Sequence, residues 1–159
     1  MKKLEKTNVM RILDQGKLEY NAYSYETDVA ISGTEVARIL GKPNDSVFKT
    51  LVTVGESKKN YVFVIPVHRE LDLKKAAKAV GEKNITMIKS KELLSLTGYV
   101  HGGCSPIGMK KSFLTVIDES ALLIDKIMFS AGKIGYQVEM SPSELKKIVD
   151  YKVFDLTVD

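Results

Sequence analysis

The chain has 159 residues, of which 44% are hydrophobic and 28% charged, with a formal net charge of +4. This size and composition predict a single domain, residues 1–159, with one continuous core. No apolar run approaches the ~18 residues that a membrane-spanning helix needs, and polar residues rather than a signal-peptide stretch follow the start. We therefore expect a soluble, cytoplasmic protein.

The lysine, cysteine and histidine residues limit which partners, disulfides and metal sites the chain can have. Lysine pairs are spread along the chain, which is typical of solvated faces, although the positive balance permits RNA as a partner. A single cysteine, Cys104, excludes an internal disulfide. His101 and Cys104 have the spacing of a metal pair, but the only other histidine is His68, so we expect no metal and no cofactor.

The first part of the chain predicts two helices and a strand. Helical spacing of apolar residues covers residues 6–13, and Gly16 is a plausible stop. Residues 20–25 alternate as a strand does. Ser32 and Glu35 then have capping-box spacing ahead of a helix that ends at Gly41.

The middle of the chain reads as a hairpin followed by shorter elements. Residues 47–54 and 61–67 are strand-like and flank a polar turn, which predicts an antiparallel pair. Asp72 is placed to cap a helix that runs to residue 80. A strand over 85–88 and a short helix over 90–96 follow.

The last third begins with a glycine-rich loop, residues 97–108. Strands are predicted over 114–117, 127–130 and 136–140, with an edge strand over 153–156. Ser141 and Pro142 start a helix, because proline suits the first helical position and Glu144 completes a capping box. The whole pattern predicts an α/β domain with a mixed sheet flanked by helices.

Lys49 is the first candidate functional residue. It lies inside the apolar run Val-Phe-Lys-Thr-Leu-Val at residues 47–52, where an ammonium is costly to bury unless it meets an acceptor or an anionic ligand. Because strand side chains alternate, Lys49 could equally point outward and keep its charge in water.

The segment Gly102-Gly103-Cys104-Ser105-Pro106-Ile107-Gly108 is the second candidate. Glycines let main-chain N–H groups approach a ligand, so the loop could hold an ester carbonyl or a phosphate, or it could simply turn the chain. It fits neither a Walker loop nor a dinucleotide fingerprint. Cys104 could be a nucleophile if His101 lay beside it, but a three-residue offset does not establish that contact, so we expect a small loop thiol without a catalytic role.

A third group of polar residues could orient a substrate or form an ordinary hairpin turn. It consists of Ser130, Gly132, Lys133 and Gln137. Tyr25 is similarly either a pocket hydroxyl or one more core aromatic.

Five blocks in one order resemble the YbaK/EbsC family of the aminoacyl-tRNA deacylase superfamily, which is related to the prolyl-tRNA synthetase editing domain. The blocks are Val-Phe-Lys-Thr-Leu at 47–51, Leu-Asp-Leu-Lys-Lys at 71–75, Thr-Gly-Tyr at 97–99, the glycine loop at 102–108 and Ser-Ala-Gly-Lys at 130–133. The resemblance covers nearly the whole chain. It implies a mixed, partly barrel-like sheet surrounded by helices.

The resemblance also implies a function and a site. It implies a trans-editing deacylase that removes cysteine from mischarged Cys-tRNA(Pro), with aminoacyl-tRNA as substrate, prolyl-tRNA synthetase as a partner and the substrate thiol as the attacking group. Lys49 occupies the key lysine position, and Gly102 begins the Gly-x-x-x-Pro loop that ends at Pro106. The substrate-binding positions are Tyr25, Gly103, Ser105, Pro106, Ser130, Gly132 and Gln137.

One departure from the family pattern and two alternatives stay open at this point. Where many relatives have Gly-Lys-Arg-Gly-Leu-Asp, this chain has Gly-Lys-Ile-Gly-Tyr-Gln at 132–137, so Gln137 stands in place of a carboxylate. The alternatives are a deacylase for another small amino acid and a non-catalytic module that binds tRNA or synthetase.

Overall fold

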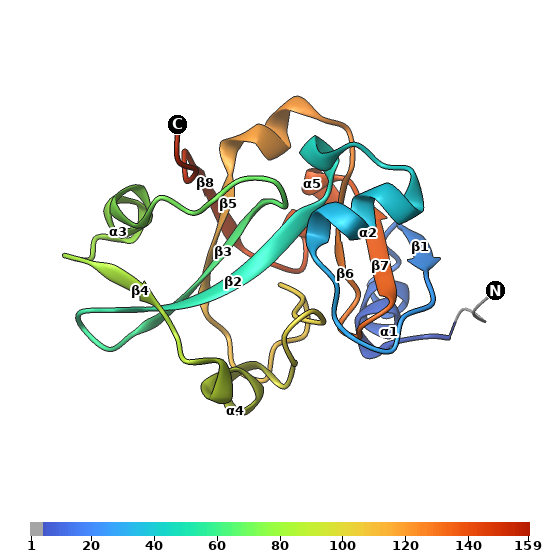
Figure 1. The fold of residues 1–159 in the computed structure, drawn as a ribbon, viewed down its shortest axis with the longest axis horizontal. Helices are drawn as coiled ribbons and strands as arrows, with labels where there is room; N and C mark the ends of the chain where they lie inside the picture. The colour runs from blue at the N-terminus through green and yellow to red at the C-terminus, as the bar shows by residue number, and fades with distance from the viewer. Residues whose placement is uncertain (1–4) are drawn as a thin grey trace.

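The computed structural model describes residues 5–159, and Figure 1 shows the arrangement of its elements. Its strands form a three-stranded sheet in the order β1-β7-β6 and a five-stranded sheet in the order β4-β2-β3-β5-β8. The strands are β1 (Asn21–Ser24), β2 (Phe48–Gly55), β3 (Asn60–Pro66), β4 (Ile85–Met87), β5 (Leu114–Asp118), β6 (Ile127–Ser130), β7 (Tyr136–Met140) and β8 (Tyr151–Phe154).

Both sheets contain pairings that no local pattern fixes. The β2–β3 hairpin is antiparallel, as predicted, but β3–β5 and β5–β8 are parallel. An isolated bridge between Val47 and Met128 joins the start of β2 to β6, so that β2 lies where the two sheets meet. The expected mixed sheet is therefore confirmed, although it is divided into two.

The helices begin where their caps predict. The α-helices are α1 (Asn8–Gln15), α2 (Gly33–Leu40), α3 (Leu73–Val80), α4 (Leu93–Thr97) and α5 (Pro142–Lys146), and the 3-10 turns are η1 (Asn44–Ser46), η2 (Ser90–Glu92) and η3 (Glu119–Leu123). Side chains of Ser32, Asp72 and Ser141 accept hydrogen bonds from main-chain N–H groups in the first turns of α2, α3 and α5. These bonds satisfy donors that the helix itself leaves free.

Two predicted helices differ from those observed. The helix predicted over 90–96 is divided into η2 and α4. α5 ends at Lys146, although the apolar Ile148 and Val149 have the spacing that predicts a longer helix. Both residues still pack against the core, and the chain turns there to place β8 beside β5.

Within residues 5–159 the buried hydrophobic residues form three clusters rather than one continuous core. The largest lies between the sheets and includes Phe48, Val64 and Phe129. A second lies between the five-stranded sheet and α3, and a third lies under α2. Helices cover the outer face of each sheet, so both faces carry apolar residues. No helix within residues 5–159 is long and apolar enough to cross a membrane.

Candidate active site

A cavity of about 330 Å³ lies between β2, the start of α2 and the glycine loop. Its size is within the range of small-molecule sites. Its ionisable lining residues within the described chain are Tyr25, Lys49, His101 and Cys104, with no carboxylate among them. The full lining is residues 25, 31–33, 36, 47–51, 67, 93, 101, 102, 104, 130 and 137.

The outer edge of β2 forms one wall of this cavity. Val67 donates its N–H to the carbonyl of Val47, and Gly55 donates to Lys59, so the odd-numbered residues of β2 bond to β3. Antiparallel strands alternate in this way, which turns the main-chain groups of Thr50 away from β3. Among the described residues of β2, β4 pairs with residues 53–55. The N–H and C=O of Thr50 thus face an unpaired edge, and the buried Thr50 hydroxyl also has no hydrogen-bond partner in the described chain.

Lys49 is half-buried and lines the cavity. Burial lowers the pKa of its ammonium below the ordinary value of 10.5, and the charge of Glu70 opposes this shift. Within residues 5–159 no carboxylate lies within ion-pair distance of the Lys49 Nζ. The cavity therefore contains a partly desolvated cation that can pair with an anion or a carbonyl.

The glycine turn supplies free main-chain donors. Gly103 donates its N–H to the carbonyl of Val100 at 2.9 Å, which closes a turn with Gly102 in its third position at φ +87°. The N–H groups of Gly102 and Cys104 have no hydrogen-bond acceptor in the part of the chain that the structure describes. Both residues line the cavity, so their donors are available to a bound ester or phosphate.

Tyr25, Gln137 and Ser130 contribute polar groups from the three-stranded sheet. Burial raises the pKa of Tyr25, while hydrogen bonds to the Gly135 main chain and the Gln137 side chain lower it. The Ser130 hydroxyl accepts the N–H of Gly132 at 3.1 Å. The Gln137 side-chain amide is therefore in contact with the Tyr25 hydroxyl.

Cys104 lines the cavity but is a poor nucleophile. Burial raises the pKa of its thiol to about 12, although a hydrogen bond with Thr97 opposes the shift. The thiolate is the reactive form, so the thiol stays protonated at neutral pH. His101 also lines the cavity, but no hydrogen bond joins it to Cys104 within the described residues. Within residues 5–159, no group of three or more potential metal ligands is present.

The structure brings five of the predicted site residues into the cavity, namely Tyr25, Lys49, Gly102, Ser130 and Gln137. The other four do not line it. Gly103 uses its N–H within the turn, and the Ser105 hydroxyl accepts the N–H of Ile107. Pro106 is buried, and a β-carbon at Gly132 would lie 3.0 Å from side-chain atoms of Val9 and Tyr99. These four residues shape the loops behind the site.

Several lining residues carry no motif that sequence reasoning could use. Thr50 lacks a signal of its own, because its importance depends on which edge of β2 is unpaired. Gly33 is recognisable only in three dimensions, since a β-carbon there would lie 2.3 Å from the Val67 side chain. This close approach places Ser32 and the N-terminus of α2 at the cavity, where helix N–H groups favour anions.

A second hollow of about 350 Å³ lies beside β1 and is lined by Glu19, Glu139, Glu144 and a single lysine, Lys126, among others. Glu139 is already held there by the Asn21 amide, the Tyr23 hydroxyl and the Lys42 ammonium. Its carboxylates would repel a phosphate. The cavity at Lys49 is therefore the better candidate.

Comparisons with known proteins relate the whole chain, rather than single site residues, to a family. The model of the "Aminoacyl-tRNA editing domain" family matches residues 29–148, which include Lys49, Gly102 and Ser130. A protein of Enterococcus faecalis (strain ATCC 700802 / V583), "Putative Cys-tRNA(Pro)/Cys-tRNA(Cys) deacylase EbsC", is 44% identical over 154 residues, 96% of this chain and 94% of that protein.

Two solved structures have a similar fold. "Crystal structure of a putative trans-editing enzyme for prolyl tRNA synthetase" is 25% identical, with a TM-score of 0.82 over 98% of this chain and 100% of that one. The hypothetical protein APE2540 is 23% identical, with a TM-score of 0.86 over 94% and 99% of the two chains, and shows the fold alone. The family model covers most of the chain, and the chain belongs to the aminoacyl-tRNA editing domain family.

Proposed function

We propose that the protein is a deacylase that cleaves the ester between cysteine and tRNA, with Cys-tRNA(Pro) as the principal substrate. The observation that carries the proposal is the convergence in one cavity of the Lys49 ammonium and the unpaired N–H groups of the glycine turn. The names of EbsC and of the trans-editing structure favour cysteine and tRNA(Pro). The family membership supports the aminoacyl ester as the bond that is cleaved.

The cavity offers each part of an aminoacyl nucleotide a complementary group. The Lys49 ammonium and the N-terminus of α2 suit the oxygen-rich ribose or the terminal phosphate. The N–H groups of Gly102 and Cys104 suit the ester carbonyl, whose oxygen gains negative charge during cleavage. The free carbonyl of Thr50 would accept a hydrogen bond from the α-ammonium of the amino acid.

The lining residues favour a reaction without a protein nucleophile. Among the described lining residues there is no carboxylate to act as a base, and burial raises the pKa of the Cys104 thiol to about 12. An aminoacyl ester is already activated, so positioning and carbonyl stabilisation can suffice. We propose that the thiol of the bound cysteine attacks its own carbonyl.

Atoms balance in this step. The sulfur forms a bond to the carbonyl carbon, the bond from that carbon to the ribose oxygen breaks, and the thiol proton passes to the ribose oxygen. The tRNA leaves with a free terminal hydroxyl. The cyclic thioester that remains is hydrolysed by water to cysteine.

A comparison of matched substrates tests this proposal. We expect multiple turnover of Cys-tRNA(Pro) and at least a hundredfold slower cleavage of Ser-tRNA(Pro), which differs only by oxygen in place of sulfur. Ala-tRNA(Pro) and Pro-tRNA(Pro) complete the panel. Equal rates with Cys-tRNA and Ser-tRNA would exclude thiol assistance. Ester loss no faster than in buffer would instead indicate a binding module.

A further inference from the structure

The two segments that flank the cavity carry opposite charge. Residues 19–35, which contribute Tyr25 and the start of α2 to the lining, contain four acidic residues and no lysine or arginine. Residues 88–113, which contribute Leu93 and the glycine turn, contain four lysines and one glutamate. The first segment includes Glu26 and Asp28, and the lysines of the second are Lys89, Lys91, Lys110 and Lys111.

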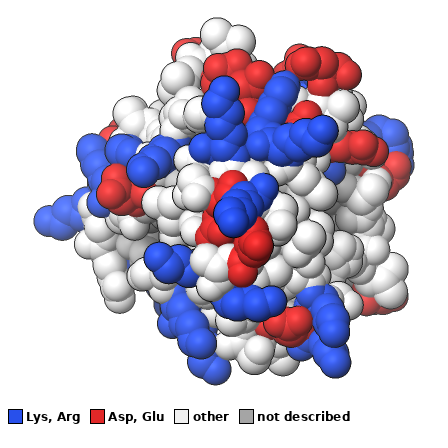
Figure 2. Space-filling model, turned by 90° about the vertical axis from the view of Figure 1, so that its left-hand side faces the viewer, with Lys and Arg blue, Asp and Glu red and all other residues white. Residues whose placement is uncertain are grey.

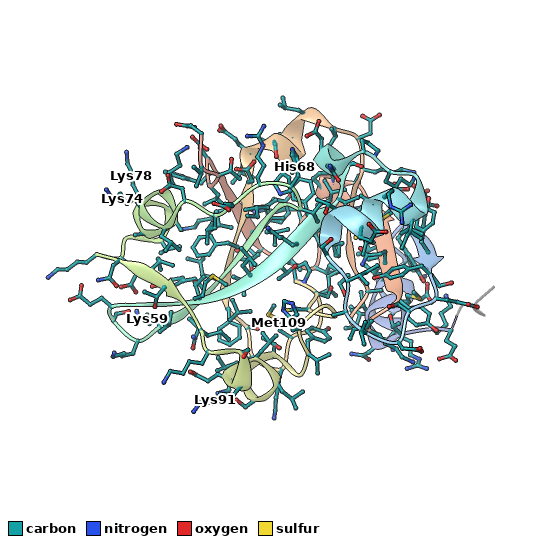
Figure 3. All side chains as sticks on the ribbon, viewed as in Figure 1. Lys59, His68, Lys74, Lys78, Lys91 and Met109 are labelled. Atoms are coloured by element: carbon teal, nitrogen blue, oxygen red, sulfur yellow. The ribbon has the colours of Figure 1, made fainter. Side chains whose placement is uncertain are left out.

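These four lysines, which we call the basic rim, surround α4. Lys89 and Lys91 lie immediately before α4, and the Lys110 N–H donates to the carbonyl of Thr97 at its end. Leu93, the first residue of α4, lines the cavity. In Figure 3, Lys91 projects outward beside α4. The basic rim is thus next to the cavity. The segment between β1 and α2 lines another part of the cavity, and Figure 1 shows this segment apart from α4.

The charges of the basic rim are not neutralised by carboxylates, in contrast to those of six other lysines in the described chain. All four side chains are exposed, and within residues 5–159 none forms an ion pair. Lysines 6, 42, 75, 133, 146 and 147 each pair with a carboxylate. Figure 2 shows lysines and acidic residues intermixed at the end of the molecule that carries α3 and the β2–β3 turn.

We infer that the basic rim binds the phosphate backbone of the acceptor end of tRNA, which therefore leaves the cavity across α4 and away from Glu26 and Asp28. This inference rests on the proposed function and adds the direction of the RNA. A phosphodiester chain would gain from four unneutralised ammonium groups on one side and would be repelled by the carboxylates on the other. The partner is RNA rather than protein, because phosphates are spaced regularly along it and need only point charges.

A matched pair of variants tests the inference. The rim variant carries Lys89→Gln, Lys91→Gln, Lys110→Gln and Lys111→Gln. The control variant carries Lys58→Gln, Lys59→Gln, Lys74→Gln and Lys78→Gln, which removes the same charge from the hairpin turn and α3 (Figure 3). KM for Cys-tRNA and the dependence of uncharged tRNA binding on salt are measured for both.

We expect the rim variant to raise KM at least tenfold and to reduce the slope of log Kobs against log salt by roughly 3, since each phosphate contact contributes about 0.7 to 0.9. The control variant should change KM less than twofold. Hydrolysis of 3′-cysteinyl adenosine, which has no phosphate, reports whether the cavity of each variant is intact.

Equal effects of the two variants on tRNA binding would overturn the inference, because the affinity for tRNA would then depend on the total charge of the protein rather than on the position of the lysines. Unchanged tRNA binding by the rim variant, with loss of binding to prolyl-tRNA synthetase, would also overturn it in favour of a protein surface. If the wild type binds tRNA through the rim but hydrolyses neither ester, the proposed function fails while the RNA path stands.

Discussion

Gly102 and Ala30 pack so closely that a β-carbon at position 102 would lie 2.5 Å from the Ala30 β-carbon. This contact fixes the glycine turn against the segment between β1 and α2, which also lines the cavity. The backbone at Gly102 has φ +87°, a conformation that residues with a side chain rarely adopt. Two independent reasons therefore require glycine at this position.

We expect Gly102→Ala to destabilise the protein by about 1–2 kcal/mol, because an alanine is strained at positive φ and also clashes with Ala30. Cys-tRNA cleavage should fall at least a hundredfold as the N–H donors move. Urea denaturation and kcat/KM measure the two effects. The double variant with Ala30→Gly removes the clash alone, so it should recover part of the stability; no recovery would show that the contact is unimportant.

Lys49→Met should abolish Cys-tRNA cleavage while making the protein more stable, by up to ~1 kcal/mol, since a partly buried ammonium is removed. Burial lowers the pKa of Lys49 in the folded state below 10.5. Between these two pKa values the unfolded chain therefore binds more protons than the folded protein does. Wild-type stability then rises with pH in that interval, and the advantage of Lys49→Met should disappear there. Denaturation of the wild type and of Lys49→Met at pH 7 and at pH 10.5 measures the stability difference at both ends of this interval. Equal stability of the two proteins at pH 7 would contradict a desolvation cost at Lys49.

Cys104 should resist alkylation, because burial raises the pKa of its thiol to about 12. We expect slow reaction with iodoacetamide at pH 8 in the folded protein and fast reaction in urea, which is the control. Cys104→Ser should keep kcat/KM within about threefold of the wild type, less than the tenfold that 1.4 kcal/mol represents. A loss of several orders of magnitude would restore Cys104 as a nucleophile.

Thr50→Val should raise stability by about 1 kcal/mol, because it replaces a buried hydroxyl that has no hydrogen-bond partner in the described chain with a methyl group of similar shape. If the hydroxyl contacts substrate, kcat/KM should fall about tenfold. Thr50→Ser keeps the hydroxyl and is the matched control. Unchanged kcat/KM in Thr50→Val would leave only the main chain of Thr50 in contact with substrate.

Local patterns predicted the elements well where their causes are local. The starts of α2, α3 and α5 follow from Ser32, Asp72 and Ser141, because a cap acts within three residues of itself. The end of α5 did not follow, since it depends on where β8 must lie beside β5. The pairing of β1 with β7 joins residues more than a hundred positions apart, and the sequence contains no signal for it.

The candidate site shows the same division. A lysine in an apolar run and a glycine-rich loop could be recognised from residue types, because burying charge is costly and positive φ favours glycine. The chain order alone did not decide whether Lys49 pointed inward, nor that Gly103, Ser105 and Pro106 would not line the cavity. The place of Thr50 in the site follows from the unpaired edge of β2. The place of Gly33 follows from the close approach of α2 to Val67.

The amino-acid sequence by itself determined where helices and strands begin, which residue types could carry the chemistry, and which family the chain resembles. The tertiary structure decided which of those residues share one cavity and on which side of it the basic rim lies. The physical reason is range: propensity, capping and turn preference act over a few residues, whereas a cavity depends on how strands far apart in the chain pair and pack.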